Sequence, residues 1–352
     1  MKLRARGRRK TNYAADIAVI HSGRQWLTLA VFISLLVILP LVLSTTRNLN
    51  WVTFLNFTLI TIIAVLGLNV TTGMAGQISL GHSAFVMLGG YGLAVLTLET
   101  GWPFWAALVV STLLTALIAL IVAIPVIRLK GFYVAVVTLA FFYIAQYIIR
   151  SLDITGGTFG LIGIPSPSIA GMSIRSDVQW YYLLLSLTAL CTIVSVNITR
   201  SRLGRSFLVV RDNDVAAAAL GVSVAVTKIR AFFVGSLFAG LAGGLWASYI
   251  SVVRLDQFTI WDSIWYLGMI VIGGAGSTAG AIMGVIFLRL ISQVLHVIGT
   301  SDWIPLSSNL TIYSTQIIYG LVIILFITLK PMGLISIWQK LKINYKRWPF
   351  GV

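Results

Sequence analysis

The chain has 352 residues, of which 58% are hydrophobic and only 10% are charged, and its formal net charge is +16 at pH 7. Soluble domains carry about 25% charged residues, so this composition excludes a chain that covers itself with polar surface and indicates an integral membrane protein. The single cysteine, Cys191, excludes a disulfide framework and a thiolate metal cluster, and the three histidines are too scattered for a metal site.

Residues 1–25 hold seven basic residues and one acid, and we expect a basic cytoplasmic tail. The apolar run Trp26–Ser44 has about the length of a membrane-spanning helix, ~20 residues, and is interpreted as an uncleaved first span. Orientation of the chain in the membrane is the simplest task for this tail. A nucleic-acid-binding arm is the alternative.

Apolar segments continue through most of the chain and predict an all-α protein with about ten transmembrane or membrane-embedded helices. Residues 26–330 form the membrane domain, and residues 331–352 form a second basic tail. The expected segments are 26–45, 51–68, 83–98, 102–127, 131–149, 179–198, 231–250, 259–274, 279–298 and 311–329. The segment 259–274 is short and could be re-entrant.

The basic residues assign the orientation of these segments. With the N-terminus inside, residues 1–25, 128–130, 200–230 and 330–352 are cytoplasmic, and they hold 20 of the 25 Lys and Arg residues. The outer stretches hold four. Because cytoplasmic loops are enriched in Lys and Arg, both termini are predicted to be cytoplasmic and the 150–178 loop periplasmic.

Glycine is abundant, with 32 residues, and it occurs in two patterns. Small residues four apart, as in Gly235, Ala239 and Gly243, let helix backbones approach closely in lipid. Elsewhere glycines interrupt apolar sequence, at 73–81 and 272–277, and divide the membrane domain into two Gly-interrupted halves. Broken backbone at membrane depth is tolerated where protein or a water-filled cavity satisfies it, so the paired breaks indicate a transport pathway. Turns without any contact to a solute are the alternative.

Arg289 lies inside an apolar segment, with Gln293 and His296 on the same helical face. An intramembrane arginine must pair, snorkel or line water. Asp262 is a possible partner, and a structural role is favoured over contact with a solute. His82, which follows the first break, is expected to be a hydrogen-bonded packing residue rather than a proton relay.

The chain lacks the sequence signatures of an energy source. It has no Gly-x-x-x-x-Gly-Lys-Ser/Thr motif for nucleotide phosphates. Intramembrane acids for a proton or sodium relay are nearly absent. Concentrating a solute a thousandfold requires about 4 kcal/mol. Uphill transport would therefore take its energy from another chain, and the charged, alanine-rich loop 200–230 is where such a chain would act.

Five motifs resemble the permease subunits of bacterial branched-chain amino acid ABC importers, the LivM type. They read GMAGQISLGHSAF (73–85), TGGTFGL (155–161), VRDNDVAAAALGV (210–222), AGLAGG (239–244) and VIGGAGS (271–277). They occur in family order over about residues 55–330. The resemblance implies a type II-like importer permease in the inner membrane. Its partners would be a second related permease, two ATP-binding subunits that carry ATP and Mg, and a periplasmic binding protein. It implies no cofactor on this chain, no nucleic acid and no enzymatic activity.

The resemblance also assigns roles to residues. A short coupling helix over about Asp214–Leu220 would insert into the ATPase, with Asp212 or Asn213 as its cap and Gly221 at its end. Arg211 would pair with an acid of the partner. In the family, a glutamate is common inside the alanine run, where this chain has alanine, so the polar contacts of the loop are open. The coupling residues are Arg211, Asp212, Asn213, Asp214, Ala216, Ala217, Leu220 and Gly221; the pathway residues are Gly73, Gly76, Gln77, Ser79, Gly81, His82, Gly273, Gly274, Gly276 and Ser277; and Thr155, Gly156 and Gly157 would contact the binding protein.

A branched-chain or other hydrophobic amino acid is the expected solute. A urea or short-chain amide permease of the same family is an alternative. A stand-alone channel or secondary carrier is less favoured, and a membrane enzyme least, because no catalytic constellation is visible.

Overall fold

A computed structural model describes residues 34–43, 49–129, 131–169, 172–299, 308–330 and 332–347. The chain divides into two compact units, Met1–Val52 and Thr53–Val352. In the first unit, the structure describes an apolar helix, Ser34–Leu43. The predicted N-terminal tail and much of the predicted first span lie outside the described residues.

The second unit is helical, with four very short strands. Helix α3 (Leu49–Leu68) enters it from the first unit. The other α-helices are α4 (His82–Leu98), α5 (Phe104–Ile127), α6 (Phe132–Ser151), α7 (Asp177–Arg200), α8 (Arg202–Asp212), α9 (Asp214–Ala219), α10 (Val224–Ile250), α11 (Ile260–Gly273), α12 (Thr278–Gly299), α13 (Ser308–Leu329) and α14 (Gly333–Arg347). A π-helix, η1 (Asn69–Met74), continues α3, and two 3₁₀ turns, η2 (Asp153–Thr155) and η3 (Leu255–Gln257), lie in connections.

Helix α10 is packed between α4 and α5, and glycines bring the backbones together. A Cβ at Gly243 would overlap the Val86 carbonyl of α4, and one at Gly89 would overlap the backbone of Gly240. Gly240 also faces α5, where a Cβ would lie 3.0 Å from Cβ of Thr115. The four-residue glycine spacing therefore serves helix packing, as predicted.

Helices α11 and α12 form a second close pair. A Cβ at Gly273 would overlap the Gly280 carbonyl, and one at Gly284 would overlap the Met269 carbonyl. Helix α13 packs against both, and Tyr319 donates a hydrogen bond to the Leu288 carbonyl at 2.9 Å.

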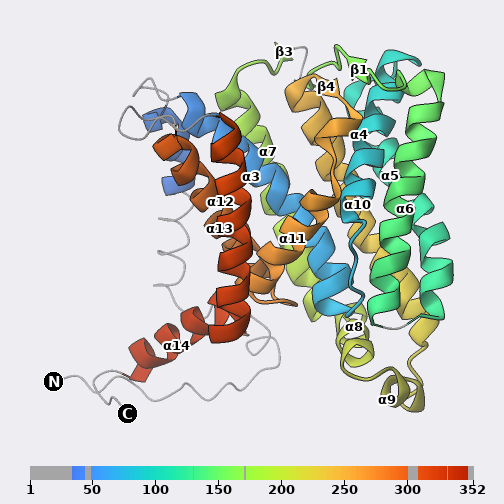
Figure 1. The fold of residues 1–352 in the computed structure, drawn as a ribbon, viewed down its shortest axis with the longest axis vertical. Helices are drawn as coiled ribbons and strands as arrows, with labels where there is room; N and C mark the ends of the chain where they lie inside the picture. Colours follow the sequence, from blue (N-terminus) through green and yellow to red (C-terminus); the bar gives the residue numbers. More distant parts are fainter. Residues whose placement is uncertain are drawn as a thin grey trace. The chain divides into compact units, whose positions relative to one another are not determined.

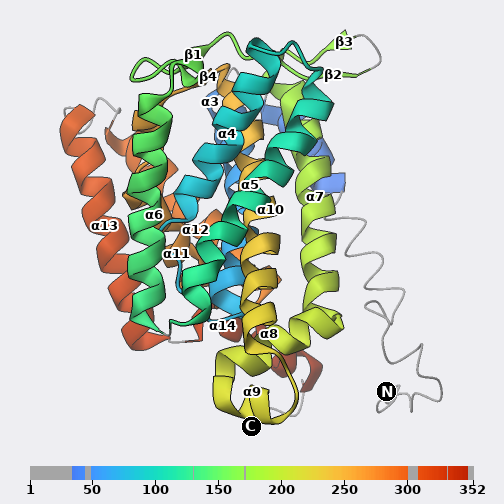
Figure 2. The ribbon, with the colours of Figure 1, turned by 90° about the vertical axis from the view of Figure 1, so that its right-hand side faces the viewer.

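Short strands and the small helices lie at opposite ends of the long helices (Figures 1 and 2). At one end, β1 (Leu161–Ile162) pairs with β4 (Val252–Val253), and β2 (Ser168–Ile169) pairs with β3 (Met172–Ser173), both antiparallel. At the other end lie α8 and α9. We call these the strand end and the α9 end.

Six helical stretches are long and apolar enough to cross a membrane, or up to seven if the bent pair Ser314–Leu329 and Gly333–Lys340 is one span. The described residues thus form a multi-pass, all-α membrane protein. Ten segments were predicted. Helix α4 has 17 residues and α11 has 14, so both are shorter than the ~20 residues of a typical span. The six stretches are Trp51–Met74, Phe104–Ile127, Phe132–Ser151, Asp177–Arg200, Val224–Ile250 and Thr278–Leu295.

Candidate functional site

The first glycine break begins later than the apolar pattern suggests. Helix α3 does not stop at Leu68 but continues as the π-helix η1 to Met74. The chain then runs without regular structure to Gly81, and α4 begins at His82. Gly76 has φ +69°, a conformation that glycine adopts without the steric cost of a Cβ. Thr72 closes the turn by donating a hydrogen bond to the Gln77 carbonyl at 3.0 Å.

Three polar side chains of this break are buried with one atom left unsatisfied. Asn69, Gln77 and Ser79 are 0%, 6% and 1% exposed. Within the described residues, Asn69 Nδ2, Gln77 Oε1 and Ser79 Oγ have no hydrogen-bond partner. A buried unsatisfied polar group costs about 1–3 kcal/mol, and such groups gather where structure serves function. Asn56, Tyr91, Trp246 and Arg289 also keep a buried unsatisfied atom, but they lie in continuous helices, so it is the coincidence of such atoms with interrupted backbone that makes η1 and the break a candidate site.

The second break lies directly against the first. Helix α11 ends at Gly273, and α12 begins at Thr278. Between them, the Gly276 N–H donates a hydrogen bond to Asn69 Oδ1 at 2.9 Å. A Cβ at Gly73 would lie 2.5 Å from the Gly276 nitrogen. The two breaks are therefore in contact in the structure, whereas the sequence related them only by their similar glycine pattern.

The remaining predicted pathway residues separate into two groups. Gly273 packs on α12, and Gly274 packs on Met332 and Ile335 at α14, while Ser277 Oγ accepts a hydrogen bond from the Gly280 N–H at 3.2 Å. Gly81 touches the Thr138 backbone of α6. These residues support the breaks, whereas Gly73 and Gly276 form the contact between them and Gly76 packs on Arg211.

The predicted loop 200–230 is mostly helical and shorter than expected. It comprises α8, α9 and the start of α10, which begins at Val224 rather than near Ala231. Because its basic residues were assigned to the loop, the predicted start of α10 lay too late in the chain. Lys228 is 1% exposed although it was assigned to a water-facing loop, because its Nζ donates to the Leu129 carbonyl at 3.0 Å and pairs with Asp214 at 3.4 Å.

Helix α9 has the ends that its sequence predicts. Asn213, and not Asp212, is the cap, because its Oδ1 accepts hydrogen bonds from the Val215 and Ala216 N–H groups at 2.9 and 3.1 Å. At the other end Gly221 has φ +80°, and the Val222 N–H donates to the Ala217 carbonyl.

The surface of α9 is apolar where it meets solvent. Val215 is 71% exposed and Leu220 is 75% exposed, whereas Ala217 between them is fully buried. The buried side packs toward α8 and α10. A six-residue helix with one buried face thus exposes one large apolar side chain, Val215, and is followed at its C-cap by another, Leu220.

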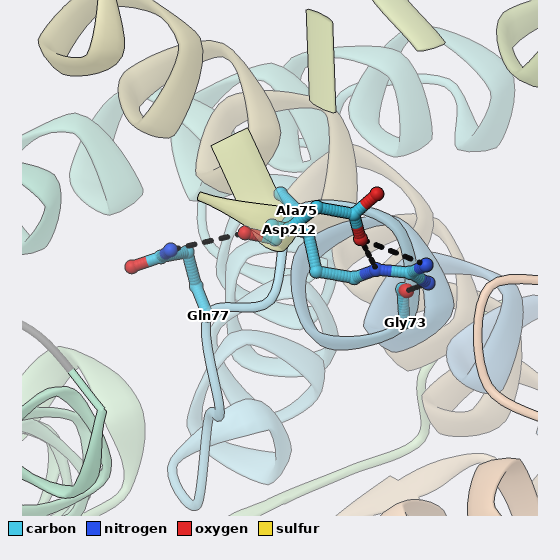
Figure 3. Close-up of polar contacts among 5 residues, drawn as sticks. Gly73, Ala75, Gln77 and Asp212 are labelled. Carbon is cyan, nitrogen blue, oxygen red and sulfur yellow. Dashed lines mark hydrogen bonds and ion pairs between the residues drawn. The ribbon is translucent and has the colours of Figure 1, made fainter. Parts of the chain in front are cut away.

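Arg211 connects this segment to both breaks, which the sequence did not predict. Its Nη1 donates a hydrogen bond to the Gly73 carbonyl at 2.9 Å. Its Nε and Nη2 both lie 3.3 Å from Asp212 Oδ1. Figure 3 shows Gly73 and Asp212 at the same guanidinium, with Gln77 pointing away from it toward the Ala75 carbonyl. The guanidinium therefore contacts the first break, with 36% of the side chain exposed, and the predicted pairing with an acid of a partner stays a prediction.

Thr155 and its neighbours lie in the connection after α6 at the strand end. Thr155 is buried and donates to the Leu152 carbonyl at 2.7 Å, so its side chain holds the turn. Gly156 and Gly157 have φ of +72° and +55°. Beside this turn, Thr158 lines a cleft of about 440 Å³ that also contains Arg150 and Arg254.

The other two polar positions have structural partners. Arg289 Nη2 donates to Thr61 Oγ1 at 2.9 Å and to the Phe57 carbonyl at 3.3 Å. Asp262, the suggested partner, instead accepts hydrogen bonds from the Thr259 N–H and hydroxyl at 2.7 and 2.8 Å. His82 is buried, with Nε2 2.9 Å from the Ala64 carbonyl, as expected for a packing residue. The side chain of His296 lies outside the described residues.

Comparison with known proteins agrees with this arrangement. The family described as the permease component of branched-chain amino acid transport systems matches residues 50–327. The high-affinity branched-chain amino acid transport permease LivM of Escherichia coli is 30% identical over 302 residues, which cover 79% of this chain and 68% of LivM. The probable LivM of Methanocaldococcus jannaschii is 23% identical over 237 residues, 65% of this chain and 67% of its own.

A more distant likeness covers less of the chain. The autoinducer 2 import system permease LsrC of Salmonella paratyphi B is 30% identical over 156 residues, 43% of this chain and 42% of LsrC. No solved structure matches.

The apolar helices and the paired breaks define a multi-pass membrane protein of the permease class. Within that class, the chain belongs to the family of branched-chain amino acid transport permeases, of the LivM type. The compared relatives are components of transport systems, not enzymes.

Proposed function

We propose that this chain is the permease subunit of an ATP-binding-cassette importer that carries branched-chain or other hydrophobic amino acids across the bacterial inner membrane. Separate subunits would bind and hydrolyse ATP with Mg. A second related permease and a periplasmic binding protein would complete the importer. Both termini and the α9 end would face the cytoplasm, and the strand end would face the periplasm.

The observation that carries this proposal is α9. A six-residue helix cannot be stable on its own, because helix nucleation is costly. Here it is capped at both ends, attached to α10 by Asp214–Lys228, and exposes Val215 and Leu220. Exposed apolar side chains on a fixed, protruding helix favour docking into a groove of another protein. Attraction to anionic lipid explains Arg200, Arg202 and Arg205, but not this capped helix.

The two breaks supply the second part of the proposal, the solute path. Solute passing between helices requires polar groups that are not already committed to the protein. Asn69 Nδ2, Gln77 Oε1 and Ser79 Oγ are such groups among the described residues, and they lie where the helices are interrupted. Interrupted helices around polar groups are typical of transport sites.

The test replaces the outward apolar residue of α9. Leu220→Asn is expected to lower co-purification of the ATPase subunits and ATP-driven leucine uptake by about tenfold, as for loss of a central apolar anchor of an interface. The matched control is Leu152→Asn, at the strand end, where Leu152 is 46% exposed. The control is expected to retain both activities.

Other solutes and mechanisms predict different results. ATP-driven uptake of urea or a short amide, and not of leucine, would support the alternative substrate class. Transport by the purified chain alone without nucleotide would indicate a channel or secondary carrier. Normal ATPase binding by Leu220→Asn would contradict the docking role of α9.

A further inference from the structure

We propose that Arg211 transmits the movement of α9 to both glycine breaks, and so positions the inner end of the solute path. The proposal rests on the proposed function and deepens it. In this view Arg211 does not contact the ATPase. Its side chain hydrogen-bonds Gly73 of η1 and Asp212 at the α8–α9 junction, and its guanidinium lies against Gly276 of the α11–α12 turn.

The first argument is the position of Arg211 in the chain. It lies in the last turn of α8, two residues before Asn213, the cap of α9. Only Asp212 separates it from that cap. Any displacement of the short, docked α9 must therefore move the backbone of Arg211, because so little chain lies between them.

The second argument is how closely the breaks enclose this side chain. A Cβ at Gly76 would lie 2.7 Å from Cγ of Arg211 and 3.2 Å from its Cα. A Cβ at Gly276 would lie 2.8 Å from Nη1. Glycine from the first break thus contacts the aliphatic stem, and glycine from the second break contacts the guanidinium. The side chain is 36% exposed on its other side, but its contacts with the breaks mean that a displacement toward them would press on both backbones.

The third argument is the hydrogen bonding around the guanidinium. Nη1 binds the carbonyl of Gly73, and Gly73 in turn is packed on the Gly276 nitrogen. Asn69 Oδ1 accepts the hydrogen bond of Gly276 N–H, which closes the junction. Asp212 binds the other edge of the planar fork and orients it. Lysine has a single ammonium group and cannot reproduce this two-edged geometry.

An apolar contact between α8 and η1 also supports transmission of movement from α8 to the first break. Phe207 is fully buried in a small cluster with Val70, Met74 and Ala75 of the first break and with Ala231 of α10. This cluster seats α8 on η1. It does not include the second break, which Arg211 alone reaches from α8 among the contacts described above.

Lys228 of α10 anchors the start of α9 to the helix bundle. Asp214 at the start of α9 pairs with the buried Lys228 of α10. This pair holds α9 to the bundle, while Arg211, three residues earlier, holds it to the breaks. The pair therefore opposes detachment of α9 from α10.

The experiment uses the complete importer reconstituted in proteoliposomes with its partner permease, ATPase subunits and binding protein. Leucine uptake and ATP hydrolysis are measured in the same vesicles for Arg211→Gln, Arg211→Lys and the wild type. The control is Arg205→Gln, since Arg205 also lies in α8 but binds only the nearby Arg200 carbonyl among the contacts described. Co-purification of the ATPase subunits is measured for each variant.

We expect Arg211→Gln to assemble normally and hydrolyse ATP while uptake per ATP falls about tenfold, the size of coupling changes produced by single residues. Arg211→Lys should recover only part of this ratio, and Arg205→Gln should match the wild type. An unchanged ratio in Arg211→Gln would overturn the proposal. Loss of ATPase subunits in that variant would also overturn it, because Arg211 would then be a partner contact.

A second measurement separates this proposal from the proposed function. Ser79→Cys, in a Cys191→Ser background, reports exposure of the first break to a thiol reagent. In protein that keeps Arg211, ATP is expected to change the labelling rate of the Ser79→Cys variant. In protein that also carries Arg211→Gln, ATP is expected to leave this rate unchanged. If leucine uptake fails but the ATP response depends on Arg211, only the solute assignment is wrong. If ATP changes labelling equally in both, the transmission role is wrong.

Discussion

Two sets of glycines in this protein have different structural settings. The ladder glycines, such as Gly243 and Gly89, lie inside helices and touch the backbone of a neighbouring helix. The break glycines, such as Gly76 and Gly276, have positive φ and touch a charged side chain. Both sets leave no room for a Cβ, so close contact alone does not separate them.

What separates the two sets is the continuity of the backbone. The ladder glycines lie within continuous helices, although Tyr91 of α4 and Trp246 of α10 each also keep one buried polar atom without a described partner, whereas the break glycines lie where helices end. The breaks lie beside Asn69, Gln77 and Ser79, each with a buried atom that no described residue satisfies. We infer that ladder glycines serve stability and break glycines serve transport, and the following predictions test this difference.

The largest effect on stability is expected at the ladder. Gly243→Val places branched carbons where a Cβ already overlaps the Val86 carbonyl, so α4 and α10 must separate. Overpacking of this kind costs about 1–3 kcal/mol and more where backbone must move. Thermal unfolding in detergent should show most of the folded protein lost. A stable Gly243→Val protein would contradict the packing role of the ladder.

The first break should respond in the opposite way, with a modest loss of stability and a larger loss of coupling. Gly76→Ala costs about 1–2 kcal/mol for a left-handed alanine, and its Cβ also displaces the stem of Arg211. The matched control is Gly101→Ala, because Gly101 has φ +65° with nothing within 4 Å of a Cβ. Equal uptake per ATP in both variants would remove the distinction between the break and an ordinary turn.

The parts that sequence predicts best are local. Asn213 and Gly221 cap α9 through residues within four positions of each, so their residue types are sufficient. The breaks are likewise visible as glycines in apolar sequence. The family assignment was also confirmed, because its motifs extend over most of the chain.

The parts that sequence missed depend on distant residues. Asn69 and Gly276 are 207 positions apart, and Arg211 and Gly73 are 138 apart, with no periodic pattern to connect them. Lys228 was assigned to a solvated loop because lysine is rarely buried. Its contacts with Asp214 and the Leu129 carbonyl satisfy the buried ammonium group. Helix α10 therefore begins about two turns earlier than predicted.

A smaller effect, opposite in sign, is expected from the unsatisfied groups. Ser79→Ala removes a buried hydroxyl without a described partner, so the free energy of unfolding should rise by about 1 kcal/mol, while uptake falls if the hydroxyl contacts the solute. Ser111→Ala is the control. Ser111 is equally buried but donates to the Leu108 carbonyl at 3.1 Å, so its removal should destabilise the protein. Destabilisation by Ser79→Ala would show that its hydroxyl is already used in packing.

The smallest effect is expected at a glycine that belongs to neither set. Gly320 lies within α13, and a Cβ there would meet nothing within 4 Å. Gly320→Ala should therefore stabilise the chain by about 0.5–1 kcal/mol through lower backbone entropy of the unfolded state. The comparison is Gly244→Ala, whose Cβ would lie 2.7 Å from Leu108 Cδ1, the flexible end of a side chain. Thermal unfolding should show a gain for the first variant and little change for the second. A loss of stability in Gly320→Ala would mean that α13 packs there against another chain, which would place a subunit contact at a glycine outside both the ladders and the breaks.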